Sequence, residues 1–212
     1  MLSIVLAVLI ITWHKQVKCQ DKIPGHFKLA GRSGVPAMHA ALLPDGNVIF
    51  LDKIEDYTEM WLPDHRLAYS SIYEPKPEVD YRLTPVPVYS NAFCCGGAYL
   101  ADGTLMTMGG NGPLTWLDDT VTDGFDALRY LYTQEKHKIW QEHQGIRMSS
   151  KRWYPSVQTL SDGRVFIAAG SLNGLDIRNN SNNNPTYELL DKDGKPQGES
   201  MPMEILVKNQ PY

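Results

Sequence analysis

The stretch that decides the fold is residues 93–111, which read FCCGGAYLADGTLMTMGGN. A cysteine–glycine turn opens it, an Asp-Gly pair at Asp102 and Gly103 separates two short segments, and a glycine pair closes it. Two short strand-forming segments joined by an Asp-Gly turn are typical of a β-hairpin. We therefore predict a strand–turn–strand unit in this stretch.

The same pattern occurs twice more, in residues 38–51 and 154–171. The Asp-Gly turns begin at Asp45, Asp102 and Asp162, which are 57 and 60 residues apart. A repeat of this length with several short strands per unit is typical of a β-propeller. The aspartates are turn residues on this interpretation, not a pair of acid–base carboxylates.

Each unit also needs an outer pair of strands, and aromatic and β-branched residues favour strands in suitable places. The expected outer strands are residues 69–73 with 81–84, 128–132 with 138–141, and 185–190 with 204–207. Three units are fewer than the roughly four to eight blades that close a propeller ring. We therefore predict an all-β fold with about three blades, the N-terminal portion of a larger propeller.

The N-terminus differs from the rest because residues 2–13 are almost entirely apolar. This length suits the core of a signal peptide and is short for a membrane span of about 20 residues. We predict a signal peptide over residues 1–19, cleaved after Cys19, and a mature propeller portion over residues 20–212. No lysine or arginine precedes the apolar run, so an uncleaved anchor is the alternative.

Export would place the mature protein outside the cell, with no stable membrane association after cleavage. Asn179 begins an Asn-Asn-Ser sequon and is the predicted glycosylation site. The formal net charge is −4 and no basic run stands out, which argues against a nucleic-acid partner.

After cleavage only Cys94 and Cys95 would remain. Adjacent cysteines cannot join distant segments, and a bond between them would need a strained ring. A disulfide framework is therefore not expected. The pair could be two buried, small, apolar side chains, which is common for free cysteine, or it could serve a redox site.

Four motifs together resemble a known family: residues 93–97 (FCCGG), 109–111 (GGN), 152–155 (RWYP) and 184–188 (NPTYE). They resemble the kelch-type propeller of the copper radical oxidases, the family of glyoxal oxidase and galactose oxidase. The resemblance is closest to the N-terminal region of glyoxal oxidase and runs from about residue 34 to residue 212. The family's propeller normally has about seven blades.

The resemblance implies roles for Cys94 and Tyr154. In the family, the matching cysteine and tyrosine are joined by a thioether, and the tyrosine binds copper and carries a stable radical. A phenolate oxygen is a good ligand for Cu(II). The implied substrates are a small aldehyde or alcohol and O₂, and the implied products are the oxidised substrate and hydrogen peroxide.

The family's remaining copper ligands, a second tyrosine and two histidines, lie in later blades. None of the histidines at positions 26, 39, 65, 137 and 143 lies in a matching motif. A single tyrosine should bind copper weakly, since affinity requires several converging ligands. We therefore expect the chain as given to be inactive, with Cys94 a free thiol and Tyr154 an ordinary phenol.

Two departures refine the resemblance. Leu172 lies near the position at which galactose oxidase has a tryptophan over its thioether, and glyoxal oxidases also lack that tryptophan. This favours the aldehyde-oxidising branch, with carboxylic acids as products. Cys95 offers a second thiol that could compete with Cys94.

A second hypothesis is a non-catalytic kelch-like module that binds a carbohydrate or a protein. The enzyme hypothesis requires a downstream Tyr-His pair and a further histidine, whereas the binding module does not. Trp153 and His39 are interpreted as packing and structural residues.

Overall fold

A computed structural model describes residues 25, 27–76, 81–176 and 178–210 of the chain. The chain divides into two compact units, Met1–Ala30 and Gly31–Tyr212. The predicted signal peptide lies outside the described residues. In the described part of the first unit, residues 25 and 27–30, there is no helix or strand. The fold described below is that of the second unit.

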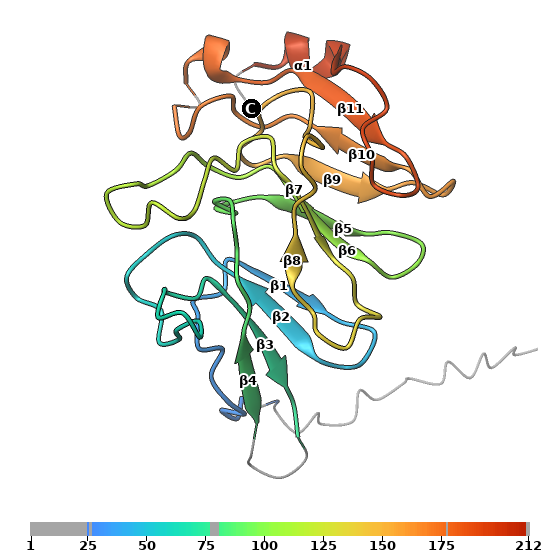
Figure 1. The fold of residues 1–212 in the computed structure, drawn as a ribbon. Coiled ribbons are helices and arrows are strands. Elements are labelled where there is room, and N and C mark those ends of the chain that lie inside the picture. Colours follow the sequence, from blue (N-terminus) through green and yellow to red (C-terminus); the bar gives the residue numbers. More distant parts are fainter. Residues whose placement is uncertain (1–24, 26, 77–80, 177, 211–212) are drawn as a thin grey trace, which may run out of the picture. The chain divides into compact units, whose positions relative to one another are not determined.

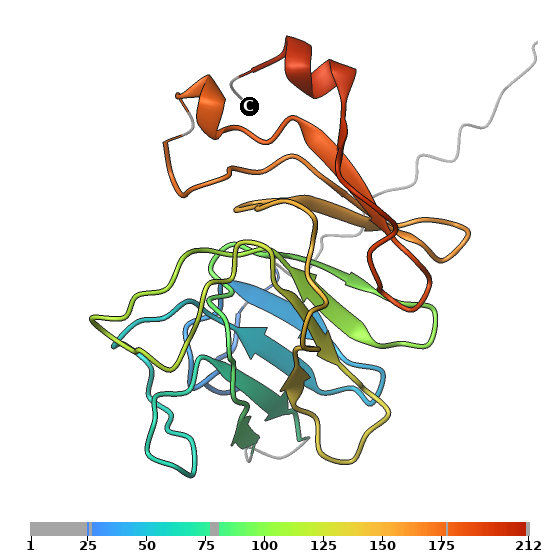
Figure 2. The same ribbon diagram turned by 45° about the horizontal axis from the view of Figure 1, so that its top comes forward.

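The second unit contains three antiparallel four-stranded sheets, each built from strands that follow one another in the chain (Figures 1 and 2). Sheet 1 contains β1 (His39–Leu42), β2 (Val48–Leu51), β3 (Ser70–Glu74) and β4 (Arg82–Pro85). Sheet 2 contains β5 (Gly96–Tyr99), β6 (Leu105–Met108), β7 (Leu128–Leu131) and β8 (Trp140–Gln141). Sheet 3 contains β9 (Ser156–Thr159), β10 (Val165–Ala168), β11 (Thr186–Leu190) and β12 (Met201–Pro202). The predictions of an all-β fold and of three units are confirmed.

The three Asp-Gly hairpins share one hydrogen-bonding pattern. The aspartate Oδ1 accepts from the backbone N–H two residues later, at 3.1 Å for Asp45, 2.9 Å for Asp102 and 3.1 Å for Asp162. The glycine that follows each aspartate has a positive φ of 84°, 85° and 88°, respectively. A side chain is disfavoured in this conformation, so the local sequence fixes the turn and thereby the register of the two inner strands.

Sheet 2 is buried on both faces. Leu105 and Leu131 pack toward sheet 1, in a cluster that includes Ile49 and Leu51. Met106 and Tyr130 pack toward sheet 3, in a cluster that includes Val165. A strand covered on both sides has no solvent-facing position, which explains why all four residues of β6 are buried.

One predicted element is wrong. Residues 204–207 were expected to form the closing strand of the third unit, but α1 (Glu204–Lys208) occupies this segment and β12 closes the sheet instead. The β-branched residues Ile205 and Val207 favoured a strand, yet neither is buried. The backbone N–H of Val207 donates to Met203 O at 3.0 Å, and Lys208 pairs with Glu204 one turn earlier. These local contacts stabilise a helical turn directly after the edge strand β12.

No helix in the described parts of the chain is long and apolar enough to cross a bilayer.

Candidate functional site

Cys94 and Tyr154 occupy equivalent places, each two residues before the first strand of its sheet. The backbone N–H of Tyr154 donates to the carbonyl oxygen of Cys94 at 3.0 Å. The Cys94 thiol and the Tyr154 phenol also lie close enough for each to shift the pKa of the other. The structure thus brings together two residues that the family motifs singled out and that lie 60 positions apart in the sequence.

The backbone of both residues is in the left-handed region, with φ of 57° at Cys94 and 62° at Tyr154. This conformation is uncommon for residues other than glycine and costs roughly 1–3 kcal/mol each. Such strain persists only where surrounding contacts impose it, and it is concentrated at functional sites. Here it directs two side chains from adjacent sheets toward each other.

Aromatic rings surround the pair. The Trp153 ring lies edge-on to the Tyr154 ring with centroids 4.4 Å apart, and its centroid is 5.8 Å from that of Phe93. Cys94 and Trp153 are each 1% exposed, whereas Tyr154 is 59% exposed. The thiol is therefore enclosed, while the phenol remains accessible to a ligand or substrate. Trp153 is a packing residue, as the sequence predicted.

The segment that carries Tyr154 is held against the glycine pair of sheet 2. The backbone N–H of Gly110 donates to Arg152 O at 3.1 Å. A Cβ atom at Gly109 would lie 2.3 Å from the same carbonyl oxygen, which is closer than real Cβ atoms approach. Trp153 and Ser171 exchange two backbone hydrogen bonds of 2.8 Å on the other side. Gly109 is thus required for the close approach that positions Tyr154.

A buried ion pair between Arg152 and Glu188 holds the same segment in place. Arg152 is 0% exposed and Glu188 is 1% exposed. Arg152 Nε donates to Glu188 Oε1 at 2.8 Å, and the rest of the guanidinium donates to Ala169 O, Thr186 O and Thr186 Oγ1. The second carboxylate oxygen accepts from the backbone N–H of Ser149 at 2.8 Å. Every group of the pair is satisfied, as a buried charge requires.

The sequence reasoning gave no role to this ion pair, although both residues lie in the family motifs. A signal was present: Glu188 lies two residues before Leu190 on β11, so both side chains fall on the same, inward-packing face. A charge on a core face needs a partner of opposite sign. The sequence did not show which of its arginines would supply that partner.

The protonation states of Cys94 and Tyr154 follow from burial and from the contact between them. Burial raises the pKa of the Cys94 thiol above its usual value, and the neighbouring Tyr154 side chain offsets part of that rise. The contact with Cys94 raises the pKa of the Tyr154 phenol. Both groups are therefore protonated at neutral pH in the absence of a metal.

Cys95 points to a different part of the molecule. It belongs to the apolar cluster between sheets 1 and 2, while Cys94 packs with Phe125 and Trp153. Burial raises the pKa of the Cys95 thiol to about 11. The structure therefore places only Cys94 beside Tyr154, which removes the expected competition between the two thiols.

The described residues alone do not fit a copper site. They contain no group of three or more His, Cys, Asp or Glu side chains close enough to hold a metal ion. Of the copper ligands that the resemblance implies, the chain matches only Tyr154. One phenol is not sufficient for tight binding, because affinity depends on several converging ligands.

Two further predicted positions lie in the loops around β10 and β11. Asn179 is exposed, and its Oδ1 accepts from the Ser181 hydroxyl at 2.7 Å and from the Ser181 N–H at 3.1 Å. It precedes a short 3₁₀ turn, η1 (Asn180–Asn182). Leu172 is 36% exposed and follows the strand-end glycine Gly170. Both residues are accessible, and their roles stay predictions.

The comparisons with known proteins confirm the resemblance of the sequence motifs to copper radical oxidases of the glyoxal oxidase type. The chain is 26% identical over 167 residues to the aldehyde oxidase GLOX of Vitis pseudoreticulata, which covers 70% of this chain and 29% of that protein. The chain thus spans less than a third of the length of this relative. No family model matches the chain.

A solved structure shows the same fold. It is a fungal alcohol oxidase of the AA5 family in complex with copper, and the TM-score is 0.53 at 18% identity. The match covers 79% of this chain and 31% of that one. Because the identity is low, this likeness bears on the fold alone.

Proposed function

We propose that the chain is the N-terminal propeller region of a secreted copper radical oxidase that acts on small aldehydes. The overall reaction converts an aldehyde, O₂ and water to a carboxylic acid and hydrogen peroxide. The contact between the Cys94 thiol and the Tyr154 phenol carries this proposal, because it joins the two residues that the family motifs match. The similarity to an aldehyde oxidase supports the substrate class.

In this proposal the region supplies the residues that form the redox cofactor. Tyr154 offers an accessible phenol oxygen as a copper ligand, and the enclosed Cys94 thiol lies beside its ring. Bound copper together with the linked tyrosine would supply two-electron oxidation. The remaining ligands must come from outside the described residues. We therefore expect no peroxide from the chain as given when it is mixed with copper and methylglyoxal.

Secretion is proposed from two features of the sequence. The apolar residues 2–13 have the length of a signal-peptide core. Asn179 is exposed at the start of a polar turn, where a glycan would meet no packed element. Export of the full chain with cleavage after Cys19 and a glycan on Asn179 are the expected observations, measured by N-terminal sequencing and mass spectrometry of the secreted product.

A chimera tests the catalytic proposal. Residues 34–210 replace the matching region of the Vitis aldehyde oxidase, which supplies the rest of the propeller. We expect the peptides that contain Cys94 and Tyr154 to become linked after copper addition, with a mass lower by two hydrogen atoms. We also expect peroxide release from methylglyoxal. Cys94→Ser and Tyr154→Phe should abolish both signals, while the control Cys95→Ser should retain them.

A chimera that is folded and loaded with copper, yet forms neither the linkage nor peroxide, contradicts the proposal. That result would favour the non-catalytic binding module. For the chain on its own, a peroxide signal that disappears in Tyr154→Phe would contradict the prediction that it is inactive.

A further inference from the structure

The two intervals between the sheets are filled differently. Between sheets 2 and 3, β5 approaches β9 so closely that a Cβ atom at Gly96 would lie 2.3 Å from Val157 Cγ2. Between sheets 1 and 2 a cavity of about 340 Å³ remains instead. Its lining includes exposed residues of β1 and β5, so the cavity opens to solvent and a small molecule can enter it.

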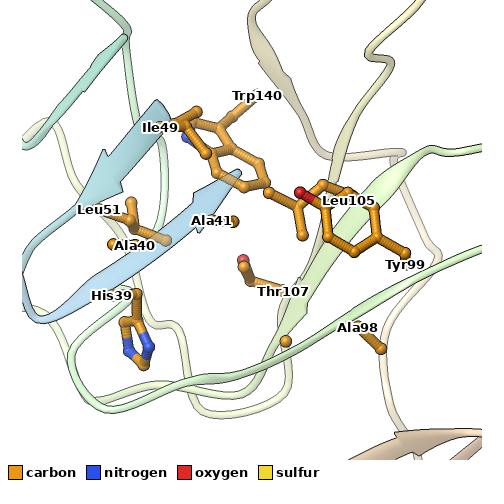
Figure 3. A pocket seen from close by; sticks show the side chains of 11 residues that line it. His39, Ala40, Ala41, Ile49, Leu51, Ala98, Tyr99, Leu105, Thr107 and Trp140 are labelled. Carbon is orange, nitrogen blue, oxygen red and sulfur yellow. The ribbon is translucent and has the colours of Figure 1, made fainter. Parts of the chain in front are cut away.

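The cavity walls come from β1 and β2 on one side and from β5, β6 and β8 on the other (Figure 3). Small residues line part of it, among them Ala40, Ala41 and Gly97, and both Ala40 and Gly97 are exposed. Apolar side chains from both sheets form most of the remaining wall, namely Ile49, Leu51, Leu105 and Trp140. The volume is at the low end of the roughly 300–1,000 Å³ of typical ligand sites, so the cavity suits a small, mainly apolar molecule.

Two buried polar atoms of the wall have no hydrogen-bond partner among the described residues: His39 Nε2 and Thr107 Oγ1. Cys95 lies near the Thr107 hydroxyl, but the hydroxyl oxygen does not meet hydrogen-bond geometry with it. Buried polar groups are almost always paired, because an unpaired one loses its bonds to water without replacement. Two unpaired groups in one cavity therefore indicate a ligand with a polar end.

The charge near these two atoms is positive. Thr107 pairs in register with Arg129 of the neighbouring strand β7, and Arg129 is 0% exposed. Its Nη1 donates to Gly109 O at 2.8 Å, while Nε and Nη2 have no hydrogen-bond partner among the described residues. Burial and the charge of Arg129 lower the pKa of His39, so its imidazole is neutral at pH 7.

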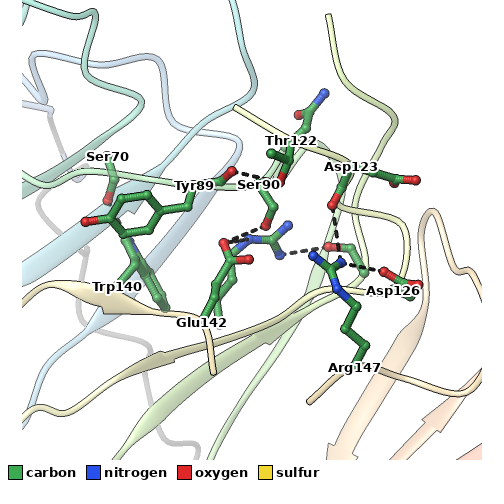
Figure 4. A network of polar contacts seen from close by, with 12 residues as sticks. Ser70, Tyr89, Ser90, Thr122, Asp123, Asp126, Trp140, Glu142 and Arg147 are labelled. Atoms are coloured by element: carbon green, nitrogen blue, oxygen red, sulfur yellow. Dashed lines mark hydrogen bonds and ion pairs between the residues drawn. The ribbon is translucent and has the colours of Figure 1, made fainter. Parts of the chain in front are cut away.

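Glu142 balances this charge only in part. Its Oε1 is 3.8 Å from Arg129 Nε, and the same oxygen accepts a hydrogen bond from Ser90 at 2.7 Å (Figure 4). The neighbouring Arg147 is paired with Asp126. Arg129 has two donor groups without a hydrogen bond among the described residues, and its counter-charges are Glu142 at 3.8 Å and Asp126, which is itself paired with Arg147. This positive charge close to the cavity favours an anionic polar end over a cationic one.

We propose that the cavity between sheets 1 and 2 binds a short aliphatic monocarboxylate, with the carboxylate at His39 and Thr107 and the hydrocarbon against the apolar wall. The Thr107 hydroxyl and the Nε2–H tautomer of neutral His39 each donate one hydrogen bond to the carboxylate. Neither Cys94 nor Tyr154 lines the cavity. This site is independent of the proposed oxidase chemistry.

Isovalerate is the probe, and 3-methylbutanol is the control ligand with the same hydrocarbon skeleton and no charge. Binding is followed by NMR on the intact chain, through the His39 imidazole signal assigned with His39→Gln. For a ligand of about seven non-hydrogen atoms we expect a Kd of roughly 1–10 mM. We expect binding of the alcohol to be at least about tenfold weaker, since it lacks the charge-assisted hydrogen bonds.

Three variants locate the site. Thr107→Val removes the unpaired hydroxyl and should weaken isovalerate binding at least about tenfold, while the unliganded chain should unfold at the same or a higher urea concentration. Ala41→Leu fills the cavity and should abolish binding. Thr115→Val makes the same change at an exposed position outside the cavity and should leave binding unchanged.

The proposal fails if isovalerate shows no saturable shift of the His39 signal up to about 50 mM, well above the expected Kd. It also fails if 3-methylbutanol binds as tightly as isovalerate, or if Thr107→Val and Ala41→Leu bind as the original chain does. Because these measurements need neither copper nor turnover, their failure is distinct from failure of the oxidase proposal.

Discussion

Replacing Glu188 by glutamine removes the negative charge from the buried ion pair that holds the Tyr154 segment. The side chain keeps its volume, so no cavity is created. Arg152 Nε would lose its ionised acceptor at 2.8 Å, while Ser149 N–H and Oγ still require an acceptor on the other side. Glutamine has one acceptor oxygen and one NH₂ donor, so one of the two donor groups must face the NH₂.

The size of the effect follows from burial. Breaking a fully buried ion pair by removing one partner costs about 3–5 kcal/mol, because the remaining charge is left uncompensated. The other hydrogen bonds of Arg152 stay in place, so we expect about 3 kcal/mol. A domain of this kind has a total free energy of unfolding of about 5–15 kcal/mol, so this loss is a large part of it.

Glu59→Gln is the matched control. Glu59 pairs with Arg32 at 2.9 Å, almost the same distance, but the two side chains are 60% and 68% exposed. An exposed pair contributes less than about 1 kcal/mol and is weakened further by salt. The same chemical change at the same distance therefore isolates the effect of burial.

Both variants are compared with the original chain by urea unfolding at pH 7, followed by far-UV circular dichroism. The reasoning predicts a lower midpoint for Glu188→Gln and almost no shift for Glu59→Gln. If the two variants lose the same free energy of unfolding to within about 1 kcal/mol, burial does not decide the strength of this pair and the argument is refuted.

Two further predictions concern packing and pH. Gly96→Ala should lower the free energy of unfolding by about 1–3 kcal/mol, because its Cβ atom would clash with Val157. The control Gly97→Ala should have little effect, because its Cβ atom would come no closer than 3.4 Å to another atom. Equal urea midpoints for the two variants would contradict this prediction. Burial raises the pKa of Asp52 to about 7, with a smaller contribution from Glu55. The folded chain thus holds this proton more tightly than the unfolded chain, and its stability falls as pH rises from about 4 to 7. Asp52→Asn cannot ionise, so its urea midpoint relative to the original chain should be higher at pH 8 than at pH 5; a difference that is constant or reversed would contradict the prediction.

Local chemistry explains what could be predicted from the sequence. The Asp-Gly turns depend on a side-chain oxygen that bonds to an N–H two residues later and on a glycine with positive φ. These interactions lie within a few residues, so the hairpins and their repeat could be identified without a structure. The error at α1 concerns a preference that tertiary structure overrode: Ile205 and Val207 favour a strand, but β12 (Met201–Pro202) already closes the sheet and the following residues form a helical turn.

The sequence by itself determined the three hairpin units, the all-β class and the family motifs that single out Cys94 and Tyr154. Only the tertiary structure decided which thiol faces the phenol, which arginine neutralises Glu188, and that one interval between sheets stays open while the other is filled. The reason is physical: turn and strand preferences act between neighbours in the chain, whereas contacts between sheets join residues tens of positions apart, and their distances depend on how whole sheets pack.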